Sequence, residues 1–342
     1  MHMINGNRPF SHGQVHYEGS DLPIIFMLSG QGSQYYHMGE NLYRNNANFR
    51  QCIQELDEQF APLVGESVLA RIYNDQMKQE DQFDDLMFTH PAIFMMEYSL
   101  CQVLLDAGIK PDCLLGASLG ELSAAAVAKS ISLADCVEFI VNQAKLFSTK
   151  CARAAMIAIV ESPDRYWQSD ILKEYSEIAG INSHSHFVVA VDVSQLDRVT
   201  HYLRQERMLF QQIPVKQGFH SSLIESVASD FQSLAAKVKF ESSIYPILSA
   251  ADVKIVKSWD SEYLWRVVRE PIAFDQSLQL LRSIGNFHYV DVGPMGTMAA
   301  LAKQNLAKKE KSVVHTILSQ FSQDEKNLQQ VISKLSGNPS WL

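Results

Sequence analysis

The chain has 342 residues, and its 29 basic and 38 acidic side chains give it a formal net charge of −9. This acidic balance argues against nucleic acid as the main partner, because contacts to phosphate need Lys and Arg. No run approaches the roughly 18 consecutive apolar residues of a membrane span. The polar first 21 residues also lack an apolar stretch typical of a signal peptide. We therefore expect a cytoplasmic protein that has a large core and no membrane association.

No pattern typical of a metal site is present. The five cysteines are widely spaced and form no Cys-x-x-Cys pair, which predicts reduced thiols. They are Cys52, Cys101, Cys113, Cys136 and Cys151. His184 and His186 are two residues apart, a spacing that fits a strand or turn, and no further ligand is close in the sequence. We expect no metal and no nucleotide, because a phosphate loop of the Gly-x-x-x-x-Gly-Lys type is also missing.

The amino-terminal part of the chain alternates between short apolar runs and helical patterns. The predicted elements are, in chain order, a buried strand closed by Gly30, a loop and helix over 31–43, an amphipathic helix over 49–60 and a helix from Pro91 to Gly108.

A serine between two glycines follows the next apolar run. Gly116, Ser118 and Gly120 match Gly-x-Ser-x-Gly, and they stand between a short predicted strand and an alanine-rich helix. This is the setting of a nucleophile elbow, in which a sharp turn exposes the serine hydroxyl. The motif by itself also fits a serine that merely caps the helix, so both interpretations stay open at this point.

The order of predicted strands and helices changes near residue 154. Over 154–214 the order strand, helix, strand, helix, strand predicts a small ferredoxin-like insertion, with 177–191 read as one strand. We therefore divide the chain into a discontinuous large domain, a small inserted domain and an N-terminal tail. Their predicted bounds are 22–153 with 215–320, 154–214 and 1–21, respectively.

Five motifs in order resemble the malonyl-CoA:acyl-carrier-protein transacylases and the acyltransferase domains of polyketide synthases. They are GQGSQ at 30–34, GASLGE at 116–121, GFHSSLI at 218–224, REPIAF at 269–274 and DVGPMGTMAAL at 291–301. The resemblance implies an α/β fold: a large α/β-hydrolase-like domain with a central parallel sheet, plus the small ferredoxin-like domain. It places the active site between the two, in a protein that we expect to be a monomer.

The resemblance also assigns roles to residues. Ser118 corresponds to the nucleophile of the family and His220 to its general base, which works without a carboxylate. The backbone N–H groups of Gln31 and Leu119 would bind the oxyanion. A backbone carbonyl that orients the histidine would fall at Val267.

Two departures from the family pattern concern the acyl group. Gln143 stands where malonyl-selecting members have an arginine that pairs with the malonyl carboxylate, a geometry that a neutral amide cannot reproduce. Lys145 would point away from that position on a helix. Ala117 replaces the usual histidine before the nucleophile, whereas Phe219 keeps the common form before His220. These residues predict a neutral acyl substrate, which could be larger than malonyl.

An intact Ser–His pair with Gln143 most resembles the discrete acyl hydrolases of trans-acyltransferase polyketide pathways. Those enzymes remove acyl groups from stalled acyl carrier proteins. The resemblance thus implies thioester hydrolysis through an acyl-serine, with carrier protein as partner and with phosphopantetheine brought by the substrate instead of a bound cofactor. Two alternatives stay open: an acyltransferase that loads malonyl, acetyl or another unit from CoA, and an inactive docking subunit of a megasynthase.

Overall fold

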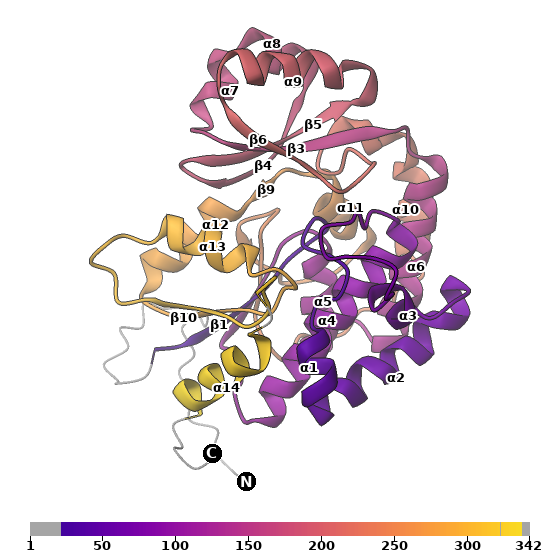
Figure 1. Cartoon of the computed structure of the whole chain (residues 1–342), viewed down its shortest axis with the longest axis vertical. Coiled ribbons are helices and arrows are strands. Elements are labelled where there is room, and N and C mark those ends of the chain that lie inside the picture. Colours follow the sequence, from indigo (N-terminus) through magenta and orange to yellow (C-terminus); the bar gives the residue numbers. More distant parts are fainter. Residues whose placement is uncertain (1–21, 322, 337–342) are drawn as a thin grey trace.

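The computed structural model describes residues 22–321 and 323–336, so the predicted tail 1–21 lies outside the described residues. A six-stranded sheet forms the centre of the larger part of the molecule (Figure 1). In spatial order its strands are β11 (Val313–Thr316), β10 (His288–Asp291), β1 (Ile24–Leu28), β2 (Cys113–Gly116), β7 (Ile247–Ser249) and β8 (Lys254–Ile255). All neighbouring pairs are parallel except β7 with β8. Strand β1 is an unbroken apolar run because both faces of a parallel sheet are covered.

Alternate residues of β1 enter two different cores. Phe26 and Leu28 face the helices on one side, whereas Ile25 and Met27 face those on the other side. The first side is covered by α2 (Ala47–Val64), α4 (Leu86–Asp106), α5 (Leu119–Val127), α6 (Leu133–Lys150), α10 (Ala228–Ala235) and α11 (Ser261–Arg269). The second side is covered by α12 (Phe274–Ile284) and α13 (Thr297–Asn305). The shorter α1 (Glu40–Asn45), α3 (Val68–Ile72) and η2 (Ser222–Val227) and the last helix, α14 (Asp324–Leu335), complete the large domain.

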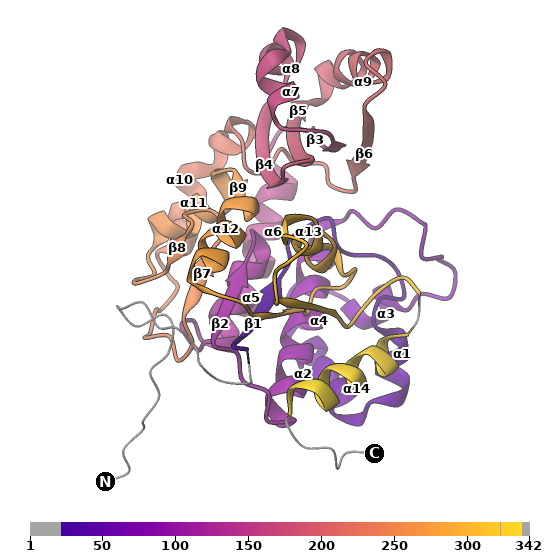
Figure 2. The same ribbon diagram turned by 90° about the vertical axis from the view of Figure 1, so that its left-hand side faces the viewer.

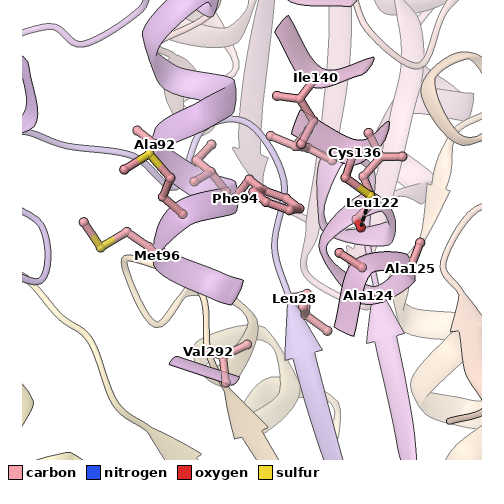
Figure 3. Packing of buried hydrophobic residues seen from close by; sticks show 14 of the residues in the cluster. Leu28, Ala92, Phe94, Met96, Leu122, Ala124, Ala125, Cys136, Ile140 and Val292 are labelled. Carbon is pink, nitrogen blue, oxygen red and sulfur yellow. Dashed lines mark hydrogen bonds between the residues drawn. The ribbon is translucent and has the colours of Figure 1, made fainter. Parts of the chain in front are cut away.

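Helix α4 packs at the centre of the first core. Figure 3 shows Phe94 of α4 pointing toward Leu122 and Ile140 on the neighbouring helices. The helix begins at Leu86, earlier than the predicted start near Pro91, because the side chain of Asp85 accepts the Met87 N–H and caps it there. Neither α4 nor any other helix within the described ranges is long and apolar enough to cross a membrane.

A separate five-stranded sheet forms the small domain, which stands above the large one in Figures 1 and 2. Its elements are β3 (Ala154–Val160), α7 (Asp164–Gln168), α8 (Asp170–Tyr175), β4 (Glu177–Ser183), β5 (His186–Asp192), η1 (Val193–Gln195), α9 (Leu196–Gln205) and β6 (Leu209–Ile213). The strand order β6-β3-β5-β4 confirms the predicted ferredoxin-like fold.

Two details of this domain differ from the prediction. The segment read as one strand is an antiparallel hairpin, because the chain reverses at His184 and Ser185, where the Ser185 N–H donates to the Ser183 hydroxyl. The fifth strand, β9 (Ile272–Ala273), comes from the large-domain part of the sequence and pairs in parallel with β4. The small sheet is therefore completed by a segment outside 154–214.

Candidate active site

Ser118 lies at a strained turn between β2 and α5. Its backbone has φ 56° and ψ −125°, a conformation that L-residues rarely adopt. Two glycines allow this turn to pack closely against the end of β1 and the loop that follows it. A Cβ on Gly120 would clash with the Leu28 carbonyl oxygen, and one on Gly30 would lie 2.8 Å from the Ser118 Cβ. No side-chain capping bond is formed by Ser118. The turn therefore has the geometry of a nucleophile elbow and not that of a serine N-cap.

The imidazole of His220 lies directly beside this serine. Its Nε2 is 2.9 Å from the Ser118 Oγ, and its Nδ1 is 2.9 Å from the carbonyl oxygen of Glu270. Since a carbonyl only accepts, Nδ1 must carry the proton, which leaves Nε2 free to accept the serine proton. Burial lowers the pKa of His220 to about 4, so the ring is neutral near pH 7.

The residue that orients His220 differs from the prediction. The accepting carbonyl belongs to Glu270 and not to Val267. Val267 lies inside α11, whereas Glu270 is the first residue beyond it and has an extended backbone that turns its carbonyl toward the ring. The carbonyl of Val268, in the last turn of α11, instead accepts the backbone N–H of His220. Val267 contributes its buried side chain to the wall of the inner cavity described below.

Two backbone N–H groups flank the nucleophile. Leu119 is the first residue of α5, and Gln31 follows Gly30 in the loop after β1. Within the described part of the chain, neither N–H has a hydrogen-bond acceptor. Free N–H groups at a helix start and in a loop beside the nucleophile are the donors that an oxyanion requires.

A buried carboxyl that the sequence analysis missed holds the Gln31 loop. Glu97, in the middle of α4, is fully buried and accepts the Ser29 N–H at 2.6 Å. The Ser29 hydroxyl lies 2.9 Å from the same Glu97 oxygen and 3.0 Å from the Ser33 hydroxyl. Ser33 in turn donates to the Gly30 carbonyl at 2.9 Å. Burial raises the pKa of Glu97 to about 8. The network fixes both sides of the loop that presents the Gln31 N–H.

A small inner cavity lies behind Ser118. Its volume is about 20 Å³, and four phenylalanines narrow it. They are Phe139, Phe147, Phe219 and Phe231. Phe219 and Phe147 pack edge to face with their ring centroids 4.9 Å apart. Because this space holds about one water-sized group, it does not support the prediction of an acyl group larger than malonyl.

The inner cavity is mostly apolar, and its few polar side chains carry no cation. Gln143, 1% exposed, lines it together with His90, a residue that the sequence analysis missed. Burial lowers the pKa of His90 to about 3, so its ring is neutral. Within the described residues, the side-chain oxygens of Gln143 and Gln31 and the Nδ1 of His90 have no hydrogen-bond partner. Lys145 is exposed and does not line the cavity, as its position on α6 predicted.

An outer cleft leads from solvent to the same serine. It has a volume of about 790 Å³ and is walled by both domains. Ala117, Ser118 and His220 line it from the large domain, and Met156 and His186 line it from the small domain. Ala117 therefore faces this cleft and not the inner cavity. No group of three or more potential metal-binding side chains occurs in the ranges that the structure covers.

Comparison with known proteins gives a consistent result. Residues 25–337 match the acyl transferase domain family. The polyketide biosynthesis acyltransferase homolog BaeD of Bacillus velezensis is 37% identical over 317 residues, covering 93% of this chain and 98% of that protein. The homolog PksD of Bacillus subtilis is also 37% identical, over 90% of this chain and 95% of its own.

Solved structures agree on the fold. The acyltransferase domain from the second module of the salinomycin polyketide synthase superposes with a TM-score of 0.81 at 25% identity, over 93% of this chain and 74% of that one. The MCAT of Streptococcus pneumoniae shares the fold with a TM-score of 0.75 at 21% identity, over 91% of this chain and 100% of its own. Because the family matches residues 25–337 and BaeD matches 93% of the chain, this chain belongs to the acyl transferase domain family.

Proposed function

We propose that this protein is a serine-dependent acyl hydrolase that removes short, neutral acyl groups from the acyl carrier proteins of a polyketide synthase. The observation that carries the proposal is the uncharged inner cavity behind Ser118, where Gln143 and the neutral His90 stand in place of a cation. A carboxylate placed there would be buried without a partner, which commonly costs about 3–5 kcal/mol. The names of the two Bacillus relatives support a role in polyketide biosynthesis.

The first half-reaction transfers the acyl group to the enzyme. Nε2 of His220 takes the Ser118 proton as Oγ attacks the thioester carbonyl. The N–H groups of Gln31 and Leu119 bind the tetrahedral oxyanion. The C–S bond then breaks, the leaving sulfur takes the proton from His220, and a Ser118 ester remains.

Water completes the proposed cycle. His220 takes a proton from water as its oxygen attacks the ester, and the proton returns to Ser118 when the C–O bond breaks. A carboxylic acid leaves and the free serine is restored. Transfer to a second thiol would use the same ester, so the two activities differ only in the acceptor. The Ser118–His220 geometry argues against an inactive docking subunit.

The decisive experiment separates these two acceptors. Purified protein is incubated with acetyl-loaded carrier protein, with and without a second, unloaded carrier protein, and the masses of both carriers are followed. Hydrolysis predicts loss of acetyl from the donor at the same rate in both reactions, with none gained by the acceptor. Acetyl appearing on the acceptor faster than free acetate would show a transferase.

A further inference from the structure

The outer cleft combines apolar side chains with neutral polar ones. Side-chain amides dominate its polar wall, from both domains and from the segment before Phe83. Those not already taken up by the loop over 31–34 are Gln79, Gln82, Asn182, Gln211, Gln212 and Gln320. Amides donate and accept hydrogen bonds without charge, which matches a pantetheine arm with its two amides and one free hydroxyl group.

Only acidic side chains bring charge to this cleft. Among its described lining residues, Glu80 and Asp81 are the charged ones, and no Lys or Arg occurs. Lys216, close to the cleft segment at Pro214, is already bound to the Asp84 carboxylate at 2.9 Å. Glu80 is exposed, and Asp81 is fixed by accepting the Lys78 N–H at 2.7 Å. The net charge of the side chains that line the cleft is therefore negative, and it lies at Glu80 and Asp81.

The helix that starts in the cleft does not offset this charge. Thr297 and Met298 of the first turn of α13 line the cleft. A free helix start could bind phosphate. Here, however, the Asp291 carboxylate already accepts the Ala299 N–H at 2.7 Å and the Gly293 N–H at 2.8 Å. The Ala299 N–H in the first turn is thus already bonded to a carboxylate, whose negative charge disfavours an anion at this helix start.

We infer that the cleft admits acyl groups on the pantetheine arm of a carrier protein and discriminates against acyl-CoA. Both donors share the arm, but CoA adds a diphosphate and a 3′-phosphate at its outer end. A carrier protein has a single phosphodiester there, held at its own surface. The neutral amide side chains of the cleft suit the arm, whereas the carboxylates of Glu80 and Asp81 repel the phosphates of CoA.

This inference rests on the proposed function. It adds a reason why the enzyme removes acyl groups from carrier proteins and does not load them. Loading a carrier protein requires a supply of acyl-CoA to acylate Ser118. An enzyme that CoA thioesters acylate poorly has no such supply, so its acyl-serine arises from carriers that are already loaded. The charge of the cleft then favours removal of acyl groups over loading.

The test compares two small donors that differ only in the nucleotide. Acetyl-pantetheine and acetyl-CoA are each mixed with the full-length protein, and acylation of Ser118 is followed by intact mass at about 0.01 M and 0.15 M salt. We expect acetyl-CoA to react about tenfold or more slowly at low salt. The gap should narrow at high salt, because the screening length falls from about 30 Å to about 8 Å.

Reversing the charge of Glu80 tests whether this carboxylate causes the difference between the two donors. Glu80→Lys should speed acylation by acetyl-CoA several-fold and leave acetyl-pantetheine unchanged. Glu58→Lys, at an exposed site on α2 outside the cleft, makes the same change in net charge and should alter neither rate. Equal rates for both donors at low salt, or equal acceleration of both by Glu80→Lys, would overturn the inference. If neither donor acylated Ser118, the proposed function itself would be overturned.

Discussion

The Glu270 carbonyl oxygen lies 2.9 Å from Nδ1 of His220, and this contact determines which ring nitrogen faces Ser118. A carboxylate at this position would attract the imidazolium and raise the pKa of the histidine. A carbonyl orients the ring with a weaker effect, so burial dominates and keeps the pKa at about 4. The base is thus held in its active, neutral form over the ordinary range of pH.

The first prediction concerns that pKa. Acylation of Ser118 needs neutral His220, so its rate should be flat from about pH 5.5 to 8 and should fall only as the pH approaches about 4. An unperturbed histidine would instead lose half of its activity near pH 6.5. Stopped-flow acylation by an uncharged acetyl thioester measures the profile. A midpoint near pH 6.5 would contradict the assignment of a buried neutral base.

The second prediction concerns the covalent intermediate. Ser118→Ala should abolish the acyl adduct seen by mass spectrometry and leave the melting temperature close to that of the parent. His220→Ala should slow acylation by about 10²–10⁴-fold, the usual range for a positioned general base. Ser222→Ala is a suitable control, because Ser222 is exposed and close to His220 in sequence. An adduct on any residue other than Ser118 would refute the site.

The third prediction concerns malonyl. Gln143→Arg should raise the malonyl-to-acetyl ratio of kcat/KM for acylation, since a guanidinium there could form two hydrogen bonds with the malonyl carboxylate. The narrow inner cavity will limit the gain, and the larger side chain should cost about 1–3 kcal/mol of stability. Gln143→Met, of similar size but uncharged, should not raise the ratio. A parent enzyme that already prefers malonyl and passes it to a second carrier faster than to water would favour a malonyl transferase.

The fourth prediction concerns acyl length. Phe147→Leu should enlarge the inner cavity and raise the butyryl-to-acetyl ratio of hydrolysis, because the ring of Phe147 packs against Phe219 at its wall. Phe60→Leu also removes a fully buried ring but lies outside both cavities. It should lower stability without changing the ratio. An identical change of ratio in the two variants would show that acyl length is set elsewhere.

The fifth prediction concerns Glu97 and stability. The carboxyl of the unfolded chain loses its proton above about pH 4.5, but the folded protein keeps it up to about pH 8. The contribution of Glu97 to stability therefore falls as the pH rises between these values. Glu97→Gln cannot ionise, so its melting temperature should rise relative to the parent between pH 5 and 8. A difference that stays constant with pH would show that Glu97 is ionised in the folded state.

Glu97 should also act as a positioning residue for the Gln31 loop. Glu97→Gln keeps an oxygen for the Ser29 N–H, so it should retain most of its kcat. Glu97→Leu removes the acceptor and should lower kcat for acylation with little change in KM, because an oxyanion donor is displaced. A purely structural role would lower the melting temperature of Glu97→Leu and leave kcat unchanged.

The sequence predicted the parts of the site that depend on local backbone pattern. The elbow at Ser118 follows from a strand, two glycines and a helix, all within a few residues. His220 came from the resemblance of its motif to the family, since no local pattern links residues 102 positions apart. The ferredoxin-like order was found as well, although the turn at His184 and Ser185 was hidden among residues that also fit a strand.

What the sequence could not supply depends on tertiary packing. Every residue has a carbonyl, so only the end of α11 reveals that Glu270 and not Val267 faces His220. Glu97 stands in an apolar helical run, and only the packing of α4 against the Ser29 loop gives it a partner. Similarly, the size of the inner cavity depends on four phenylalanines from three segments: two from α6, one from the loop before η2 and one from α10. A buried Glu or His in an apolar helix was the available signal for Glu97 and His90.

The pairing of β9 with β4 has a consequence for how the small domain is joined to the active site. The two domains are connected at three places. The chain enters the small domain before β3 and leaves it after β6, and β9 of the large-domain sequence pairs with β4 of the small domain. Glu270 lies two residues before β9, so the third connection also carries the group that aligns His220. The segment that pairs with the small-domain sheet and the group that orients the catalytic imidazole are thus two residues apart, so the seating of the small domain and the alignment of His220 are physically linked.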